Sequence, residues 1–203
     1  MGKGSAVVRI AAAIAVLALF AFAPPASAAD EPKPDAMVNN PPFENWSSFP
    51  VGTAVTQRET VQLNDGTKVA VDIISKLVKK SKESVVVETT MAEVGGNTSS
   101  GVAGATSTTA TYPAQVKMSQ VDTPAAASNT VTEGTDAVAF QGKTATAEWT
   151  NVVTRVGDEV TEEKIWTLKD IPDGIFRRTI VKKKDGEVTS SSTLELVDVK
   201  PGA

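Results

Sequence analysis

Short turn signals at regular intervals constrain the fold of this chain more than any other feature of its sequence. Four of them divide the last third of the chain, at 141–142, 156–158, 172–174 and 184–186, and each contains a glycine. Turn signals spaced about ten to fifteen residues apart, between segments rich in β-branched residues, are typical of an antiparallel meander. The sequence therefore predicts five consecutive strands: Thr130–Phe140, Lys143–Thr154, Glu159–Leu168, Ile175–Lys183 and Glu187–Val199.

The first half of the chain continues this pattern. Asn64-Asp65-Gly66 is a strong hairpin signal, because Asn and Asp accept left-handed geometry and Gly adopts a positive φ without steric cost. A helix is the alternative over 71–80, but the β-branched residues there favour a strand. Further strands are predicted over 53–63, 69–78, 83–94 and 113–121.

Between these segments lie stretches that predict loops. Residues 95–110 are rich in Gly, Ser, Thr and Ala and carry no charge, so we expect a flexible loop at about 95–112. A second loop is expected over 122–129. The fold class is therefore mainly β, a single curved antiparallel sheet or half-barrel of about 8 strands with a short N-terminal helix.

The N-terminus has the three parts of a secretory signal. A basic start is followed by the uncharged apolar run Ile10–Ala23, by two prolines and by the small residues Ala26-Ser27-Ala28. The run is shorter than the ~20 apolar residues that a membrane anchor needs. We predict a signal peptide over 1–28, with cleavage after Ala28 or, as the alternative, after Ala29. A flexible leader over 29–40 and a single domain over 41–203 follow.

The aromatic residues near the start of the domain predict a short helix. Asn40 can act as its N-cap and Pro41 as its first residue, which places Phe43, Trp46 and Phe49 on one side at spacings of three. We expect this helix to cover the end of the sheet. An exposed aromatic contact patch is the alternative.

Composition excludes several classes of function. The chain has no His and no Cys, so it lacks the commonest general base and the usual ligands of zinc, iron–sulfur and copper sites. An enzyme built from it would rely on carboxylates, Lys, Tyr112 or a bound cofactor.

Removal of the signal with Lys3 and Arg9 would make the net charge of −4 more negative by two. Interspersed charges of this sign argue against nucleic acid and anionic membrane surfaces as partners.

No motif predicts catalytic, cofactor-binding or metal-binding residues. Gly142-Lys143-Thr144 ends like a P-loop, but the first glycine is missing and a strand follows instead of a helix. Glu162 and Glu163 would face opposite sides of a strand and so would not form a carboxylate pair. Arg177 and Arg178 would do the same. A calcium site in the turn before this acidic run is a minor alternative to a solvated hairpin.

Two tryptophans and one turn are the remaining structural candidates. Trp149 and Trp166 lie in neighbouring predicted strands and can pair across the sheet as part of its core. Pro172 fixes φ and Gly174 adopts a positive φ, while Trp166 packs where the strand turns a corner. Possible hydrophobic-face or structural residues are thus Trp46, Phe49, Trp149, Trp166, Pro172 and Gly174.

These residues carry a resemblance to a group of uncharacterised secreted bacterial proteins of planctomycete type. The resemblance rests on 142–149, on 164–175 with its Trp…Pro-Asp-Gly signature, on a strand ending at Leu196, and on a Trp-x-x-Phe-x-x-Gly pattern over 46–52. It skips 95–129. The chain departs from the pattern at Thr167 and Asp173, and it lacks a cysteine in the Trp149 strand. At fold level the group looks like the curved sheets of bacterial lipoprotein carriers (LolA-like), which hold acyl chains.

Two functions follow as hypotheses. The first is a non-catalytic binding or envelope-structural module, exported to the periplasm or beyond, that holds a lipid or other apolar ligand on its concave face or binds an envelope protein. No nucleic acid, no cofactor and no integral membrane position are expected. The alternative is a carboxylate-based hydrolase acting on envelope polymers. Fold likeness alone does not choose between them.

Overall fold

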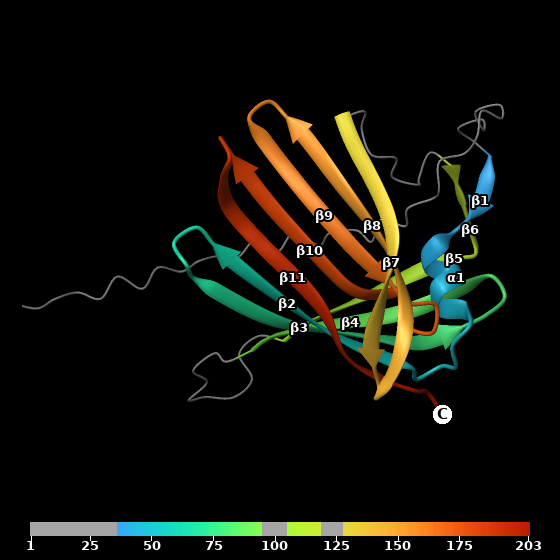
Figure 1. Ribbon diagram of the computed structural model, residues 1–203. Helices are drawn as coiled ribbons and strands as arrows, with labels where there is room; N and C mark the ends of the chain where they lie inside the picture. Colours follow the sequence, from blue (N-terminus) through green and yellow to red (C-terminus); the bar gives the residue numbers. More distant parts are fainter. Residues whose placement is uncertain (1–35, 95–104, 119–127) are drawn as a thin grey trace, which may run out of the picture.

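The structure, a computed structural model, describes residues 36–94, 105–118 and 128–203, and most of them belong to one curved antiparallel sheet (Figure 1). Nine strands form this sheet in the order β5-β4-β3-β2-β11-β10-β9-β8-β7, and it is open, with β5 and β7 at its edges. The strands are β2 (Ala54–Leu63), β3 (Lys68–Lys80), β4 (Ser84–Glu93), β5 (Thr106–Pro113), β7 (Ser128–Phe140), β8 (Lys143–Val156), β9 (Glu159–Thr167), β10 (Ile175–Lys184) and β11 (Glu187–Lys200).

The sheet consists of two meanders joined along one seam. The first runs from β2 to β5 and the second from β7 to β11, and each strand pairs with its neighbour in sequence. The seam is the antiparallel pairing of β2 with β11, in which Val55 lies opposite Val199 and Thr60 opposite Thr193. The predicted C-terminal meander is confirmed, with strand ends that differ from the prediction by a few residues at most.

Three predictions about the N-terminal half need correction. The sequence predicts a flexible loop at about 95–112, but Thr106–Pro113 forms edge strand β5. Its threonine-rich sequence pairs along β4. Met37–Asn39 (β1), in the expected leader, pairs with Gln115–Lys117 (β6) in a second, two-stranded sheet. The large sheet has nine strands, against about eight expected. The predicted signal over 1–28 and residues 95–104 lie outside the described residues.

The hairpins follow the turn chemistry of the sequence. Gln141 and Gly142 have φ values of 49° and 74°, and Asp185 and Gly186 have 52° and 84°. Positive φ at both central residues marks the two-residue turns that match the twist of antiparallel strands. The first turn fixes the register of β7 with β8, whereas a bulge at Lys182/Lys183 shifts the register of β10 with β11 beyond the second turn.

Helix α1 (Pro41–Ser47) packs against β4 and β5. Pro41 begins the helix, as predicted, but the side chain of Asn40 does not cap it and instead donates to the carbonyl of Pro113, 2.8 Å away. The exposed fraction of Trp46 is 4%. Its cluster also contains Val55, Leu77, Val85 and Val87, with Phe43, Phe49, Tyr112, Leu196 and Val199 packed around it. The short helix is therefore held by one buried aromatic anchor.

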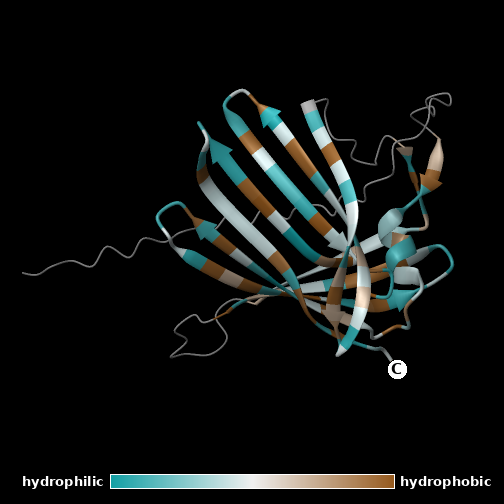
Figure 2. Ribbon diagram, in the orientation of Figure 1, coloured by the Kyte–Doolittle hydropathy of each residue, from teal (hydrophilic) through white to brown (hydrophobic). Residues whose placement is uncertain are grey.

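A second cluster lies at the end of the β7–β8 hairpin. Ala147, Leu168 and Ile171 are buried there, and Phe140 meets Phe176 edge to face with ring centroids 6.3 Å apart. Along the strands apolar and polar residues alternate in stripes (Figure 2), as expected for a sheet with two different faces. No helix among the described residues is long and apolar enough to cross a membrane.

The sheet has two faces that the register defines. The face toward α1, which we call the cavity face, includes Gln57, Thr150, Ile165, Arg178 and Leu194. The opposite face carries Trp149 and Trp166, which are direct cross-strand partners as predicted, together with Lys164, Arg177 and Glu195.

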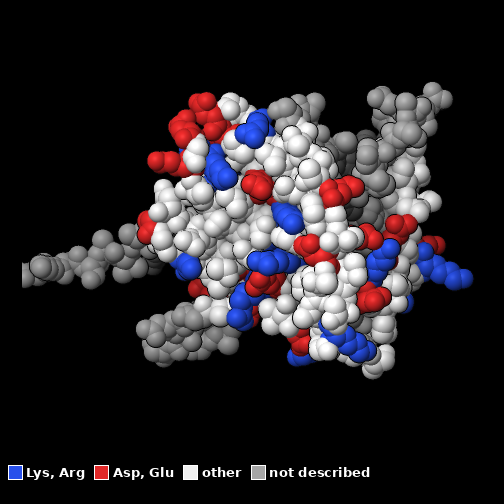
Figure 3. All heavy atoms as spheres, in the orientation of Figure 1, with Lys and Arg blue, Asp and Glu red and all other residues white. Residues whose placement is uncertain are grey.

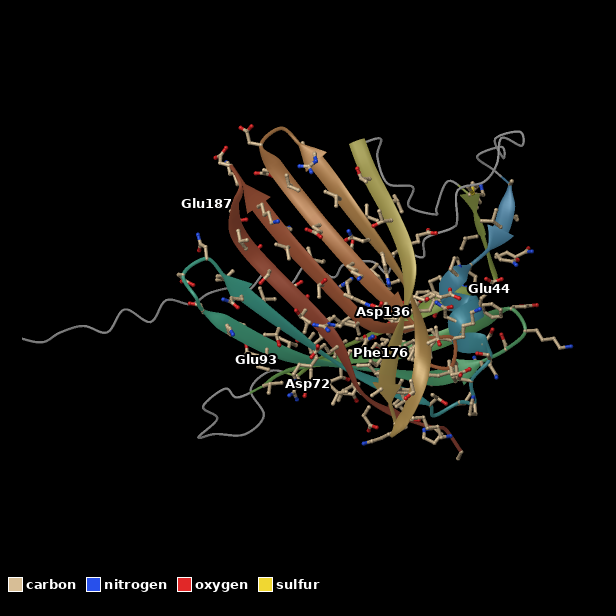
Figure 4. All side chains as sticks on the ribbon, in the orientation of Figure 1. Glu44, Asp72, Glu93, Asp136, Phe176 and Glu187 are labelled. Carbon is tan, nitrogen blue, oxygen red and sulfur yellow. The ribbon has the colours of Figure 1, made fainter. Side chains whose placement is uncertain are left out.

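On the opposite face, Lys164 lies between the two tryptophans. Its Nζ is 3.9 Å from the Trp149 ring centroid and 4.5 Å from that of Trp166. The Nε1 of Trp166 donates to Asp136 Oδ2 at 2.8 Å (Asp136 is labelled in Figure 4). Both tryptophans are half-buried, so they form a cation–aromatic stack on this face of the sheet instead of a fully buried core.

Gly134→Ala is expected to destabilise the protein, because Gly134 lies opposite Trp149 and an added Cβ would be 2.5 Å from Cζ2 of the indole. Alanine normally stabilises a strand relative to glycine, so a loss of stability in this variant would indicate a clash with the Trp149 ring. We expect a loss of about 1–3 kcal/mol in the free energy of unfolding, measured by denaturant titration. With Trp149→Leu already present, the added methyl group should cost little. Equal stability of Gly134→Ala and the wild type would contradict this packing.

Candidate binding cavity

A cavity of about 880 Å³ lies between α1 and β5 on one side and β7, β8 and β9 on the other. This volume is within the range of roughly 300–1,000 Å³ found for small-molecule sites. The curvature of the sheet brings its two edges toward each other (Figure 1). Residues of both edges line the cavity. Its lining residues are Pro42, Asn45, Trp46, Tyr112, Thr135, Thr144, Ala145, Thr146, Glu148, Thr150, Ile165, Thr167, Leu168, Lys169, Asp170, Asp173, Gly174 and Ile175.

Strand alternation positions the wall formed by β8 and β9. Thr146, Glu148 and Thr150 follow each other at every second position of β8, and all three line the cavity. Thr150 lies opposite Ile165 of β9, and Glu148 lies opposite Thr167. This wall therefore combines hydroxyl groups with methyl and isoleucine carbons, and it can contact both polar and apolar parts of a ligand.

The turn over 168–174 forms the floor of the cavity. The N–H of Leu168 donates to the carbonyl of Gly174 at 2.8 Å, and the N–H of Gly174 donates to the carbonyl of Ile171 at 3.1 Å. Pro172 is fully buried, and Asp173 and Gly174 have φ values of 75° and 74°. The left-handed backbone at Asp173, unusual for a non-glycine residue, directs the chain back into β10 and places an acidic residue in the wall.

Asp173 is the most perturbed titratable group among the described residues. Burial raises the pKa of its carboxyl from 3.8 to about 7, although a hydrogen bond from Gln57 and the positive charge of Arg178 both act to lower it. Gln57 is itself buried, and its Nε2 also donates to the carbonyl of Ile175 at 3.1 Å. Near neutral pH the carboxyl can therefore either donate or accept a hydrogen bond.

Two further polar groups share this environment. Burial, and secondly the negative charge of Asp173, raise the pKa of the Tyr112 phenol. Burial also raises the pKa of Glu163, an effect that the charge of Arg178 opposes. Glu162 points to the opposite face, where it lies 4.0 Å from Lys183 Nζ, so the predicted separation of Glu162 and Glu163 is confirmed.

The structure brings only some of the predicted residues to the cavity. Trp46 and Gly174 line it, and Pro172 is buried in its floor. Phe49 packs against the Trp46 cluster without lining the cavity, and Trp149 and Trp166 lie on the opposite face. Within the described parts of the chain, no three acidic side chains are grouped so that they could hold a metal ion.

Sequence reasoning missed Asp173 and Gln57. Asp173 was interpreted only as a departure from a glycine in the turn signature, and a Pro-Asp-Gly turn is ordinarily solvated. Gln57 shares its parity with Val55 and Val61, so a polar residue on the apolar side of β2 was the available signal. Tyr112 had been named only as a residue on which an enzyme of this composition could rely.

Comparisons with known proteins give no family and two solved structures of low similarity. No family model matches the chain, and no curated protein matches it. Among solved structures, an S-type phycobiliprotein lyase from Guillardia theta is 13% identical, with a TM-score of 0.28, over 74% of this chain and 89% of that one. A putative outer membrane lipoprotein-sorting protein domain from Vibrio parahaemolyticus is 6% identical, with a TM-score of 0.32, over 74% and 85%.

The second structure belongs to the class to which the sequence analysis likened the fold. At these TM-scores neither similarity carries an argument about the fold or the function of this chain. The resemblance to secreted planctomycete-type proteins finds no support in the comparisons and stays a prediction.

Proposed function

We propose that the protein is an exported, non-catalytic binding module that holds a small, largely apolar ligand in the cavity between α1 and β8–β9. One observation carries the proposal. The curved sheet leaves a space of about 880 Å³ on the side where α1 packs, and side chains of both sheet edges line it.

The lining supports a ligand with an apolar body. Ile165 and the methyl groups of threonines on β7, β8 and β9 supply apolar surface, with the buried side chains of Trp46, Leu168 and Ile175 behind them, and the threonines also supply hydroxyl groups. Sites of this kind bind ligands through apolar contact and use a few polar groups to orient them. Native mass spectrometry of protein purified from its own host is the direct test. A co-purifying small molecule is the expected result, and an apo mass throughout would contradict the proposal.

Thr135→Trp is expected to weaken binding of Nile red, a neutral apolar dye, by about tenfold or more, because an indole at this position enters the cavity. Thr132→Trp is the matched control. Both threonines are exposed on β7, but Thr135 lines the cavity while Thr132 lies on the opposite face, across from Asn151. Dye fluorescence measured against protein concentration gives the affinity. Equal affinities for the two variants would place the dye site elsewhere and overturn the proposed cavity function.

A carboxylate-based hydrolase is the second candidate, and one observation favours it. Asp173 and Glu148 line the same cavity, and a carboxyl with a pKa of about 7 is protonated often enough to act as a general acid. Release of soluble fragments from dye-labelled envelope polysaccharide, lost in Asp173→Asn, would support this candidate. No release by the wild-type protein would leave the binding module as the function.

A further inference from the structure

We propose that the cavity selects amphiphiles with a cationic head group, such as an alkylammonium, over anionic amphiphiles of the same chain length. This inference rests on the proposed binding function and adds the chemical class of the ligand. It follows from the charges and the aromatic ring that line the cavity, because the apolar surface alone would accept either class.

The ionisable groups of the lining are mostly acidic. Glu148, Asp170 and Asp173 contribute carboxyl groups, and Lys169 contributes the single basic group of the lining. Lys169 Nζ lies 3.6 Å from Glu148 Oε1, and its side chain is 88% exposed. The ammonium group of Lys169 is thus directed to one carboxylate and to solvent, and it leaves Asp170 and Asp173 without a lysine partner in the cavity wall.

The charged groups behind the wall do not reverse this balance. Arg178, on the cavity face of β10, is close enough to Asp173 to lower its pKa, and it acts on Glu163 in the same way. One guanidinium is therefore shared between two carboxyl groups. An anionic head group entering the cavity would meet more negative than positive charge, and a cationic head group would meet the reverse.

One aromatic ring strengthens the preference. Tyr112 is half-buried and lines the cavity, where burial and the negative charge of Asp173 raise the pKa of its phenol, whereas Trp46 is 4% exposed and offers little of its ring to a ligand. Ammonium groups bind over the faces of Trp and Tyr rings through cation–π attraction, which is strongest where the cation is desolvated. The Tyr112 ring beside the Asp173 carboxyl suits an alkylated ammonium group and offers no favourable contact to a sulfate or carboxylate head group.

Three dodecyl amphiphiles test this preference. Dodecyltrimethylammonium, dodecyl maltoside and dodecyl sulfate, each below its critical micelle concentration, compete with Nile red for the purified full chain at pH 8. We expect the ammonium compound to displace the dye at a concentration at least tenfold lower than the sulfate, with the neutral maltoside between them. At this pH the carboxyl of Asp173 is mostly ionised.

Glu148→Gln is expected to reduce the preference severalfold, and Glu195→Gln is its matched control. Both glutamates form exposed ion pairs of similar length, Glu148 with Lys169 at 3.6 Å and Glu195 with Arg177 at 3.5 Å, but Glu195 lies on the opposite face. The two variants change the net charge equally. An equal loss of preference in both would assign the effect to overall charge and overturn the inference.

The inference and the proposed function can fail separately. If dodecyl sulfate displaces the dye as well as dodecyltrimethylammonium while Thr135→Trp still weakens dye binding, the cavity binds ligands without this selectivity, and only the inference is overturned. If Thr135→Trp and Thr132→Trp bind the dye equally, the cavity function itself is overturned.

Discussion

The free energy of unfolding should fall as the pH rises from 5 to 8, and Asp173→Asn should remove most of this dependence. The folded state holds the Asp173 proton up to a pKa of about 7, whereas the unfolded chain releases it near 3.8. Stability from the protonated carboxyl is therefore full below the unfolded pKa and is lost as the pH rises through the folded one. Between pH 5 and 8 this difference corresponds to at most about 3 kcal/mol.

Denaturant titrations of both proteins at pH 5 and pH 8 measure the effect. Asparagine tolerates the left-handed backbone at this position, where φ is 75°, so the variant tests the charge and not the turn. Asp170→Asn changes a neighbouring exposed carboxyl and should keep the wild-type slope. A smaller slope of the same sign should remain in Asp173→Asn, because burial also raises the pKa of Glu163. An unchanged slope in Asp173→Asn would contradict the burial of this carboxyl.

Trp46→Ala is expected to cost about 3–5 kcal/mol in the free energy of unfolding. The ring is 4% exposed and packs against Val55, Leu77 and Val85, which are fully buried. Helix α1 has seven residues, too few to be stable without tertiary contacts. Losing the ring should therefore detach α1 and remove one wall of the cavity.

Denaturant titration and Nile red binding measure the two consequences together. Trp46→Phe keeps an aromatic ring in the cluster and should retain most of the stability and dye affinity. Ser47→Ala, at the end of the same helix, should behave like the wild type, because its hydroxyl makes only an exposed 3.3 Å hydrogen bond to the Glu44 carbonyl. A loss below about 1 kcal/mol in Trp46→Ala would mean that α1 is not anchored by this residue.

The sequence predicts the C-terminal meander well, because its turns carry strong local chemistry. Gly142 and Gly186 follow residues that also adopt positive φ, and these two-residue turns leave little freedom in the strands on either side. The sequence does not predict the strand Thr106–Pro113, because its small polar residues are also typical of a loop. They form a strand by pairing with β4. Local patterns describe hairpins better than they describe edge strands.

The cavity could not be predicted, because it depends on how far the sheet curves. Tyr112 and Thr146 belong to different meanders, and no pattern in either strand indicates that both line one space. The raised pKa of Asp173 has the same origin. It depends on burial in the folded chain, and a Pro-Asp-Gly turn does not reveal whether its carboxyl faces water or the interior.

The β2–β11 seam has a consequence for how the molecule forms. The strands that unite the two meanders come from opposite ends of the domain, and Gly202, almost at the C-terminus, donates its N–H to Thr53 Oγ1 at 3.0 Å. Each meander can assemble from local hairpins, but closing the seam requires the longest loop in the chain, which is the slow kind of step in β-sheet folding. In the large sheet, the pairing of β2 with β11 is the one strand pairing that joins the two meanders. The cavity, whose walls come from both meanders, therefore depends on this seam.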